Sequence, residues 1–281
     1  MNGATVAGEL PADVSSVDKW ILSRLQHVIA EVDEQFAGYE FAKACDTLYH
    51  FAWDDVCDWY VELSKPVLAA GGTEADRTRR VLGHVLDQLL RLLHPVVPFV
   101  TEALWTALTG GESLVVAGWP QADGARLDPA AEAEVAALQD VVTEVRRFRS
   151  EQGLRPSQRV AARIGGLPAT GIAAHEPLVR ALTRLETPED GFAPTASLSV
   201  RSATVELDLS GAIDVAAERA RLAKDLAAAE KELRTATAKL ANTDFIDKAP
   251  EAVVTKVRTR LASAESDVER ITGQLAALPT P

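Results

Sequence analysis

The sequence predicts a mainly α-helical protein: an antiparallel helical bundle, a small α+β linker domain and a C-terminal antiparallel two-helix coiled coil. Three observations carry this prediction. Long segments of the first half repeat apolar residues three and four positions apart, as amphipathic helices do. Short strand-like segments are confined to residues 159–209. The last part of the chain carries two heptad stripes separated by a turn, which is the pattern of a coiled-coil hairpin.

The 281 residues divide into four expected segments, and 47% of the residues are apolar, which suffices for about two domains. Residues 1–14 are expected to be disordered or a remnant of cloning. Residues 15–126 form the bundle, residues 127–210 the α+β domain, and residues 211–281 the arm.

Caps and turn residues define the helices of the bundle. Ser15 or Ser16 can cap the first helix, and Thr73 can cap the third. The second helix is rich in aromatic residues and is expected to stop before Pro66, because proline lacks the backbone N–H that a helix interior uses. Pro98 suits the first turn of the fourth. The four helices are expected at residues 15–37, 41–65, 73–94 and 98–108.

The α+β domain follows a stretch that contains Trp119 and Pro120. Asp128 and Pro129 begin a helix that runs to about Gln152, with the acidic cap and the first-turn proline in the expected order. Gly211 marks a hinge into the arm. Strands are expected at residues 159–164, 197–200 and 204–209, and a helix at residues 176–185.

The arm is predicted from two apolar seams. Asn242 is expected to stop its first helix, and Pro250 suits the first turn of the second. A hairpin of this kind has little core and no room for a catalytic pocket, so it is suited to reaching a partner. The seam residues are Leu222, Leu226, Ala229, Leu233, Ala236 and Leu240 in the first helix, and Val254, Val257, Leu261, Ala264, Val268, Ile271, Leu275 and Leu278 in the second.

The net charge of −12 argues against indiscriminate nucleic-acid binding over the whole surface. From residue 212 to residue 278 the acidic and basic residues are equal in number, so the acidity lies upstream of the arm.

Cys45 and Cys57 are expected on one helix about 18 Å apart, too far for a disulfide. No apolar run reaches the roughly 20 residues of a membrane span, and no signal peptide is visible, so we expect a cytoplasmic protein.

The chain lacks the common signatures of catalysis. It has no phosphate-binding loop, no glycine-rich dinucleotide fingerprint and no Cys/His cluster at zinc spacing. Its five histidines lie singly, and we expect each to be structural or exposed. The informative signals therefore concern binding, and no catalytic, cofactor or metal residue is predicted.

A first binding signal is the trio Arg146, Arg147 and Arg149 near the end of a predicted helix. Arginine presents a planar fork of donors that suits phosphate. The alternative is favourable placement of cations at a helix C-terminus, worth about 0.3–1 kcal/mol. The spacing alone leaves both interpretations open.

A second signal lies on the arm, where Lys256 and Arg260 stand one turn apart on one face. Like charges at this spacing repel mildly, and a polyanion would relieve the repulsion. Arg258 lies beside them, and Arg234 stands at a similar distance from the tip on the other helix. The alternative is a solvated flank paired with Glu251, Glu230 and Glu232.

A third signal is the aromatic second helix, which contains Phe41, Tyr49, Phe51, Trp53, Trp59 and Tyr60. Exposed aromatic rings could stack on nucleic-acid bases. Aromatic residues in a bundle more often fill its core, and we expect these to do so.

Several strings together resemble class I aminoacyl-tRNA synthetases of the valine, isoleucine and leucine subgroup. Residues 18–25 (DKWILSRL), 58–65 (DWYVELSK) and 94–105 (HPVVPFVTEALW) are similar to helices of the anticodon-binding domain. Residues 211–215 (GAIDV) and 240–254 (LANTDFIDKAPEAVV) resemble the C-terminal coiled coil of the valyl-tRNA synthetases. The resemblance covers nearly the whole chain from about Pro11.

The resemblance implies a tRNA-binding C-terminal fragment of valine–tRNA ligase. In that family the arm reaches the outer corner of the tRNA, which implies that Lys256, Arg260 and Arg234 meet tRNA(Val). Neither of the family's catalytic signatures is present, and the editing domain is missing. The implied partners are tRNA(Val) and the catalytic and editing domains of the same enzyme, which would use ATP and magnesium. This chain alone is expected to be monomeric and inactive.

Two rival interpretations stay open at this point. The coiled coil could be a protein–protein interaction module without an RNA role, since Glu and Arg pairs beside a seam can set the choice of partner. The second rival interpretation is a free-standing enzyme of unknown type, and the missing catalytic motifs argue against it.

Overall fold

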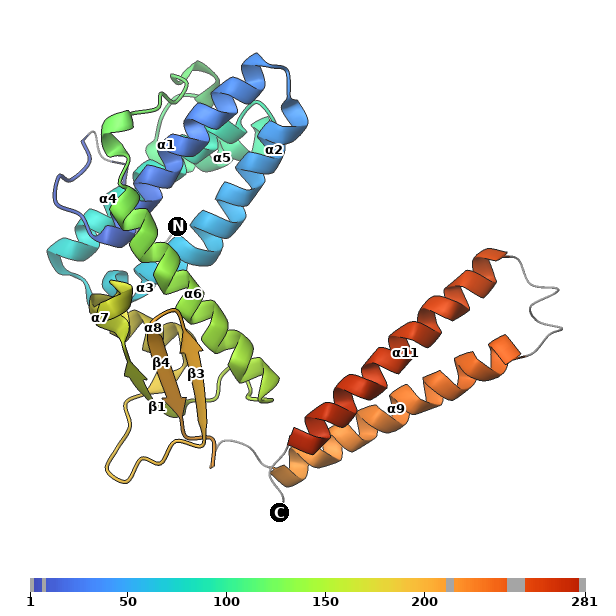
Figure 1. The fold of residues 1–281 in the computed structure, drawn as a ribbon. Helices are drawn as coiled ribbons and strands as arrows, with labels where there is room; N and C mark the ends of the chain where they lie inside the picture. Colours follow the sequence, from blue (N-terminus) through green and yellow to red (C-terminus); the bar gives the residue numbers. More distant parts are fainter. Residues whose placement is uncertain (1–2, 7–8, 211–214, 242–250, 278–281) are drawn as a thin grey trace.

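The computed structural model describes residues 3–6, 9–210, 215–241 and 251–277, and it confirms the predicted fold class (Figure 1). A helical bundle is followed by a small α+β unit and a two-helix hairpin. The longer helices are α1 (Ser16–Ala37), α2 (Phe41–His50), α3 (Val61–Ala70), α4 (Gly72–Leu93), α5 (Pro98–Thr109), α6 (Pro129–Glu151), α8 (Glu176–Thr183), α9 (Val215–Ala241) and α11 (Glu251–Ala277). Shorter elements are the π-helix η1 (Phe51–Tyr60), the 3₁₀ turns η2 (Leu114–Val116), η3 (Gly124–Arg126) and η4 (Ala173–His175), and α7 (Leu167–Thr170).

The bundle begins at a cap that the sequence predicts. The Ser15 hydroxyl accepts a hydrogen bond from the Asp18 backbone N–H at 3.1 Å, which satisfies one free donor of the first turn. Helix α1 then buries Trp20, Ile21 and Leu25 against its neighbours. Because α1 contacts α2, α4 and α6, it forms the centre of the bundle.

The predicted end of the second helix is wrong. The chain stays helical past Pro66 to Ala70, and a ten-residue π-helix, η1, joins α2 to α3. Pro66 removes one backbone donor, but the following turn still packs on α4 and Leu63 is fully buried. Tertiary packing therefore outweighs the local cost of the proline, about 3 kcal/mol in an unsupported helix.

The aromatic helix is a core element on one face only. Phe51 and Tyr60 are buried, as expected. The prediction is wrong for Phe41, Tyr49 and Trp53, which are 56%, 58% and 56% exposed. These three rings lie on the solvent-facing side of α2 and η1, where Phe41 has the rings of Phe36 and Tyr39 at 6.0 and 6.2 Å and Tyr49 has that of His50 at 5.5 Å.

The α+β unit contains a four-stranded sheet in the order β2-β1-β4-β3, built from β1 (Val160–Gly165), β2 (Leu185–Glu186), β3 (Ala196–Val200) and β4 (Ala203–Leu207). Strands β1, β3 and β4 match the three predicted ones and pair antiparallel. The two-residue strand β2 pairs parallel to β1 and was not predicted, because two residues carry no alternation.

Helix α6 contacts α1 of the bundle as well as α8 and β3 of the α+β unit. One helix thus serves both units, and the predicted boundary near residue 127 stays a prediction.

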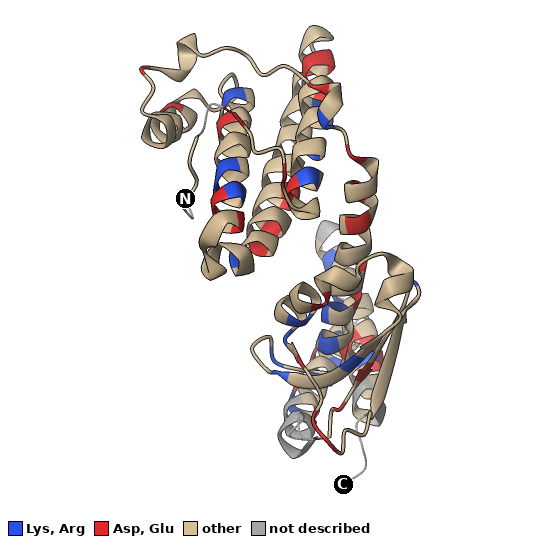
Figure 2. Cartoon of the chain, turned by 90° about the vertical axis from the view of Figure 1, so that its left-hand side faces the viewer, with Lys and Arg blue, Asp and Glu red and all other residues tan. Residues whose placement is uncertain are grey.

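Acidic and basic residues are interspersed over the bundle helices (Figure 2). Among the described residues, no helix combines the length and the apolar character needed to cross a membrane.

Gly166 gives a stability prediction for the α+β unit. Its φ is +77°, and a Cβ there would lie 2.1 Å from the Ser202 carbonyl oxygen. We expect Gly166→Ala to lower the free energy of unfolding by about 2–3 kcal/mol, measured by urea denaturation. The control is Gly171→Ala, whose φ is also positive but whose Cβ meets nothing within 4 Å, with an expected cost of about 1 kcal/mol. Equal losses in the two variants would contradict this account.

His84 gives a pH prediction for the bundle. Burial, together with the positive charges of Arg126 and Arg91, lowers the pKa of His84. The unfolded chain then binds a proton first as the pH falls below about 6.5, so the contribution of neutral His84 to stability is present above that pH and lost below it. When the pH is lowered from about 7.5 to about 5.5, the free energy of unfolding should fall less in the His84→Gln variant than in the wild-type protein. Urea titrations at both pH values measure this. An identical loss in both proteins would rule this out.

Candidate nucleic-acid interface

The hairpin formed by α9 and α11 is held by the predicted seam. Within the described residues, each seam position is buried or half-buried. The predictions for Asn242, Pro250, Gly211 and Leu278 fall on residues outside the described part of the chain. The buried members are Leu222, Ala236, Val254, Val257, Ala264 and Ile271.

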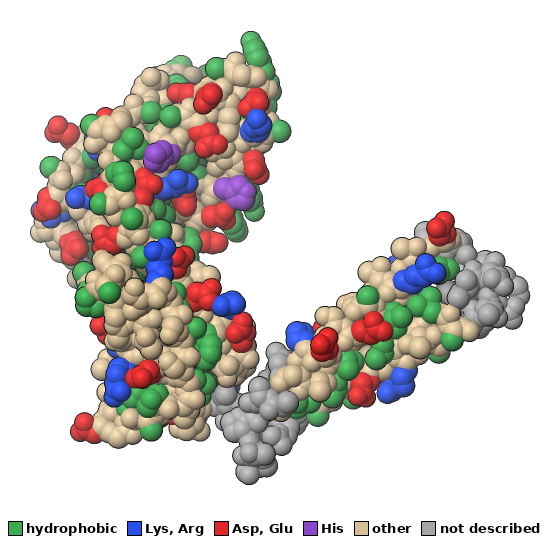
Figure 3. Space-filling model, viewed as in Figure 1, with side chains coloured by type: hydrophobic (Ala, Val, Ile, Leu, Met, Phe, Trp, Pro, Cys, Tyr) green, Lys and Arg blue, Asp and Glu red, His purple; other side chains and the backbone are tan. Residues whose placement is uncertain are grey.

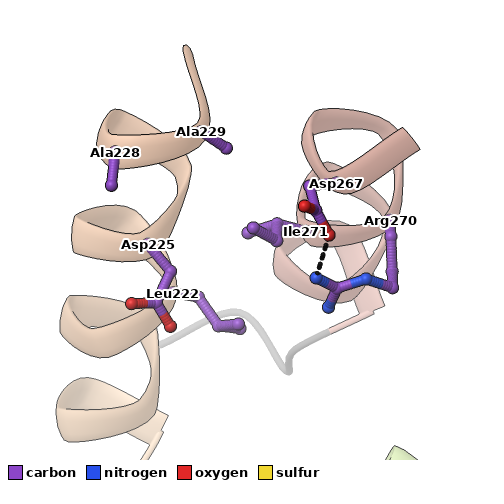
Figure 4. Close-up of a pocket in the computed structure, with 7 residues that line it drawn as sticks. All are labelled: Leu222, Asp225, Ala228, Ala229, Asp267, Arg270 and Ile271. Atoms are coloured by element: carbon purple, nitrogen blue, oxygen red, sulfur yellow. Dashed lines mark hydrogen bonds and ion pairs between the residues drawn. The ribbon is translucent and has the colours of Figure 1, made fainter. Parts of the chain in front are cut away.

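Contacts between the helices show that they run antiparallel. At the end near the body, Leu222 and Ile271 point toward each other between the helices (Figure 4). They line a shallow groove of about 410 Å³, beside which Arg270 pairs with Asp267 at 2.7 Å. Further out, Arg260 reaches Glu232 on the opposite helix. The charged side chains that line the groove are Asp225, Asp267 and Arg270, and Arg270 is paired with Asp267.

Charge is distributed unequally along the hairpin. We define the outer half as residues 231–241 and 251–260, next to the segment that joins the helices. The outer half contains six bases and two acids, whereas the inner half, residues 215–230 and 261–277, contains four bases and six acids. Basic side chains are visible near the outer end in Figure 3. The outer-half bases are Lys231, Arg234, Lys239, Lys256, Arg258 and Arg260.

Two of the predicted contact residues are held by glutamates. The Arg260 guanidinium lies 2.8 Å from the Glu232 carboxylate across the hairpin. Arg234 lies 3.6 Å from Glu230, one turn away on its own helix. Both arginine side chains stay more than half exposed, so the pairs are solvent-screened and worth about 0–1 kcal/mol each.

Lys256 and Arg258 are the other two predicted contacts on the arm. Both side chains are exposed, and neither has a hydrogen-bond or ion-pair partner among the described residues. No acidic residue stands three or four positions from either of them on α11. The described part of the arm therefore presents two exposed, unpaired cations beside the loosely held Arg260, an arrangement that attracts a polyanion.

All three body arginines contact other groups of the protein, and Arg149 is buried whereas Arg146 and Arg147 are exposed. Arg149 is 5% exposed and donates to the Gln158 carbonyl oxygen at 2.5 Å. Burial and the charge of Arg184 lower its pKa. Arg146 donates to the Leu182 carbonyl oxygen, and Arg147 pairs with two glutamates of its own helix. Their tRNA contact stays a prediction, and so does the alternative of cations placed favourably at the end of a helix.

One cluster in the body has the residue types of a nucleophile triad. His175 approaches Glu134 at 2.6 Å and the Ser16 hydroxyl at 3.2 Å. Both contacts use the same imidazole nitrogen, Nε2, so the carboxylate does not orient the ring from its far side as a triad requires. Among the described residues, no group of His, Cys, Asp or Glu is arranged to hold a metal ion. Cys45 and Cys57 are both free.

Sequence reasoning missed the charge difference between the two halves of the arm. The whole arm is neutral, and only a separate count for each half separates the basic outer half from the acidic inner half. It also missed the pairing of Arg260 with Glu232. The seam predicts that the helices are antiparallel but does not fix which flanking residues meet.

Two family descriptions match this chain. Residues 18–164 match the anticodon-binding domain of tRNA ligase, and residues 214–279 match the valyl tRNA synthetase tRNA binding arm. The first match covers the bundle, α6 and most of β1. The second covers the hairpin and includes all four arm cations discussed above.

Curated proteins that are similar to this chain are named valine–tRNA ligases. The chain is 60% identical to a valine–tRNA ligase of Streptomyces coelicolor, 59% to one of Streptomyces avermitilis and 54% to one of Nocardia farcinica. Each match covers 99% of this chain and 32% of the relative, so the chain spans about a third of their length. The chain therefore belongs to the anticodon-binding domain family of tRNA ligases, and it corresponds to the C-terminal part of the valine–tRNA ligases.

Proposed function

We propose that this chain binds tRNA(Val) and positions it for aminoacylation by an ATP-dependent catalytic domain of the same enzyme. In this proposal Lys256, Arg258, Arg260 and Arg234 contact tRNA phosphates. The observation that carries it is the basic outer half of the hairpin, which lies within the segment that matches a tRNA-binding arm.

Phosphate recognition suits the contacts of these side chains. An exposed cation gains most from a phosphate when it has no partner within the protein, as holds for Lys256 and Arg258 among the residues that the structure describes, so these two make the first contacts. Arg260 exchanges its screened pair with Glu232 for a bidentate phosphate contact. None of these side chains reads a base in this proposal, so the arm contributes affinity and register rather than sequence discrimination.

The chemistry of aminoacylation belongs to parts of the longer enzyme in this proposal. ATP and magnesium bind there, and the editing domain lies there as well. The described part of this chain offers no metal cluster or nucleophile constellation that would replace them. We further propose that the protein is cytoplasmic and that this chain is a monomer.

We expect the purified chain to bind tRNA(Val) in a filter-binding assay and to form no valyl-adenylate in an ATP–pyrophosphate exchange assay. Sedimentation equilibrium without RNA should give the mass of one chain. Exchange activity would contradict the assignment of chemistry to other domains. A mass that rises with concentration, together with no RNA binding, would contradict the tRNA-binding role and favour a protein-interaction module.

A further inference from the structure

Arginines are concentrated where α6 ends. Residues 146–163 run from the end of α6 through the following turn into β1, and they contain six arginines and one acid, Glu151. The chain as a whole has a net charge of −12. Such a local excess of one sign in an acidic protein creates a positive potential that attracts anions.

The end of α8 lies beside this segment and adds a further arginine. The Nε of Arg146 donates to the Leu182 carbonyl oxygen at 3.1 Å, and Arg184 follows as the C-cap residue of α8. The backbone carbonyl oxygen of Arg184 accepts from the Val160 N–H at 3.2 Å. Burial and then the charge of Arg184 lower the pKa of Arg149, so these two cations lie close together.

The turn after α6 completes the group. The Nη2 of Arg149 donates to the Gln158 carbonyl oxygen, and the Gln158 backbone N–H donates to the Arg155 carbonyl oxygen at 3.0 Å. The side chains of Arg146, Arg155 and Arg184 are exposed, whereas Arg149 is buried. We define the α8-end patch as Arg146, Arg149, Arg155 and Arg184.

The α8-end patch is not neutralised by carboxylates. Among the described residues, none of its four arginines forms an ion pair, and the buried Nη1 of Arg149 has no hydrogen-bond partner. A guanidinium does not give up its proton, and a buried charge is screened little by salt, so Arg149 adds to the potential at the surface. The other three arginines of residues 146–163 are paired with glutamates: Arg147 with Glu144 and Glu151, Arg159 with Glu186, and Arg163 with Glu206.

A purely structural role explains only part of this arrangement. A cation at the end of α8 offsets the partial negative charge of the free carbonyl groups there, and Arg146 does this by its bond to Leu182. Arg155 and Arg184 make no side-chain hydrogen bond or ion pair in the described part of the chain. Two exposed guanidinium groups beside a buried one repel each other unless an anion lies between them.

We propose that Arg155 and Arg184 contact phosphates of the tRNA backbone, with Arg146 and the buried Arg149 adding positive charge beside them. The inference rests on the proposed function, because its ligand is the same tRNA that the arm binds. Arginine suits this contact, since its planar fork of donors matches a phosphate. Arg184 lies outside both segments that match a family description, so this surface is additional to the arm. Two surfaces that hold one ligand strengthen each other.

The test is filter binding of tRNA(Val) to the full chain across a salt series. We expect Arg155→Gln/Arg184→Gln to lower the affinity about 5- to 20-fold at low salt, with a salt dependence shallower by about one per cation. Glutamine keeps most of the length of the side chain, and circular dichroism checks the fold.

The matched control is Arg159→Gln/Arg163→Gln. It removes the same charge from the same unit, but these two arginines lie 3.6 Å from Glu186 and 3.3 Å from Glu206. The control should leave tRNA affinity within about twofold, because a paired cation has less to gain from a phosphate. Equal losses in the two double variants would reduce the effect to net charge and overturn the proposal.

Other results separate this proposal from the arm. Unchanged affinity in Arg155→Gln/Arg184→Gln, with weakened binding in Lys256→Ala/Arg260→Ala, would overturn the α8-end patch and leave the arm in place. The reverse pattern would support the patch and contradict the arm. A melting temperature that inorganic phosphate raises only when Arg155 and Arg184 are present, with tRNA affinity unchanged by their loss, would assign the patch to free anions instead. No tRNA binding by the wild-type chain would contradict both surfaces.

Discussion

Lys256→Ala/Arg260→Ala is expected to lower the affinity for tRNA(Val) roughly 10- to 100-fold at low salt. The two cations stand one turn apart on the exposed face of α11, in the basic outer half of the hairpin. Each lost phosphate contact removes counterion release, so the dependence of log affinity on log salt should become shallower by about one per cation. Adding Arg258→Ala should weaken binding further. Filter binding across a salt series measures both effects.

The matched control removes the same charge from the inner half. Lys224→Ala/Arg270→Ala also deletes two cations from the hairpin, one on each helix, but in the half where acids predominate. It should leave tRNA affinity within about twofold, because charge at this distance is screened by salt. If both double variants lose affinity equally, the effect comes from total charge and the outer half is not the contact surface.

The second large effect concerns the stability of the bundle. Asp18 is 1% exposed, and its carboxylate accepts hydrogen bonds from the hydroxyls of Tyr60 at 2.6 Å and Thr78 at 3.0 Å. Ser15 donates to it as well, at 2.8 Å. Burial and the Asp18 carboxylate together raise the pKa of the Tyr60 phenol well above its usual range. This network joins α1, η1 and α4 at one buried point.

Asp18→Ala should therefore lower the free energy of unfolding by about 3–5 kcal/mol in urea denaturation. The substitution leaves two buried hydroxyls without their acceptor, and each unsatisfied group costs about 1–3 kcal/mol in addition to the cavity. Asp13→Ala serves as the control, because its carboxylate is exposed and pairs with the side chain of Arg77 at 2.8 Å. A cost below about 1 kcal/mol for Asp18→Ala would show that the network does not stabilise the bundle.

Patterns that repeat over many residues were predictable from the sequence. The seam of the hairpin and the buried face of α1 are both periodic, and many side chains together fix each of them. The caps at Ser15 and Asp128 were also predictable, since their side chains bond to backbone N–H groups within three residues. In these places the local chemistry and the tertiary fold agree.

Features that depend on distant neighbours were not predictable. Nothing near Pro66 in the sequence shows that α4 supports the helix past it. The burial of Phe51 and the exposure of Trp53 depend on where α1 and α4 lie, not on residue type.

The candidate site was predictable only in part. Lys256 and Arg258 have no partner in the described part of the chain because no acid stands a turn away on their helix, which is a local property. The partner of Arg260 comes from α9 and depends on the register of the hairpin. The engagement of Arg149 by Gln158 likewise depends on how the chain turns after α6.

The most direct test of the tRNA-binding arm is the salt dependence of tRNA(Val) binding by the wild-type chain. If Lys256, Arg258, Arg260 and Arg234 each contact a phosphate, log affinity should fall with log salt with a slope of about −3 or steeper. A slope near zero, or no binding at the lowest salt, would contradict phosphate contact by the arm.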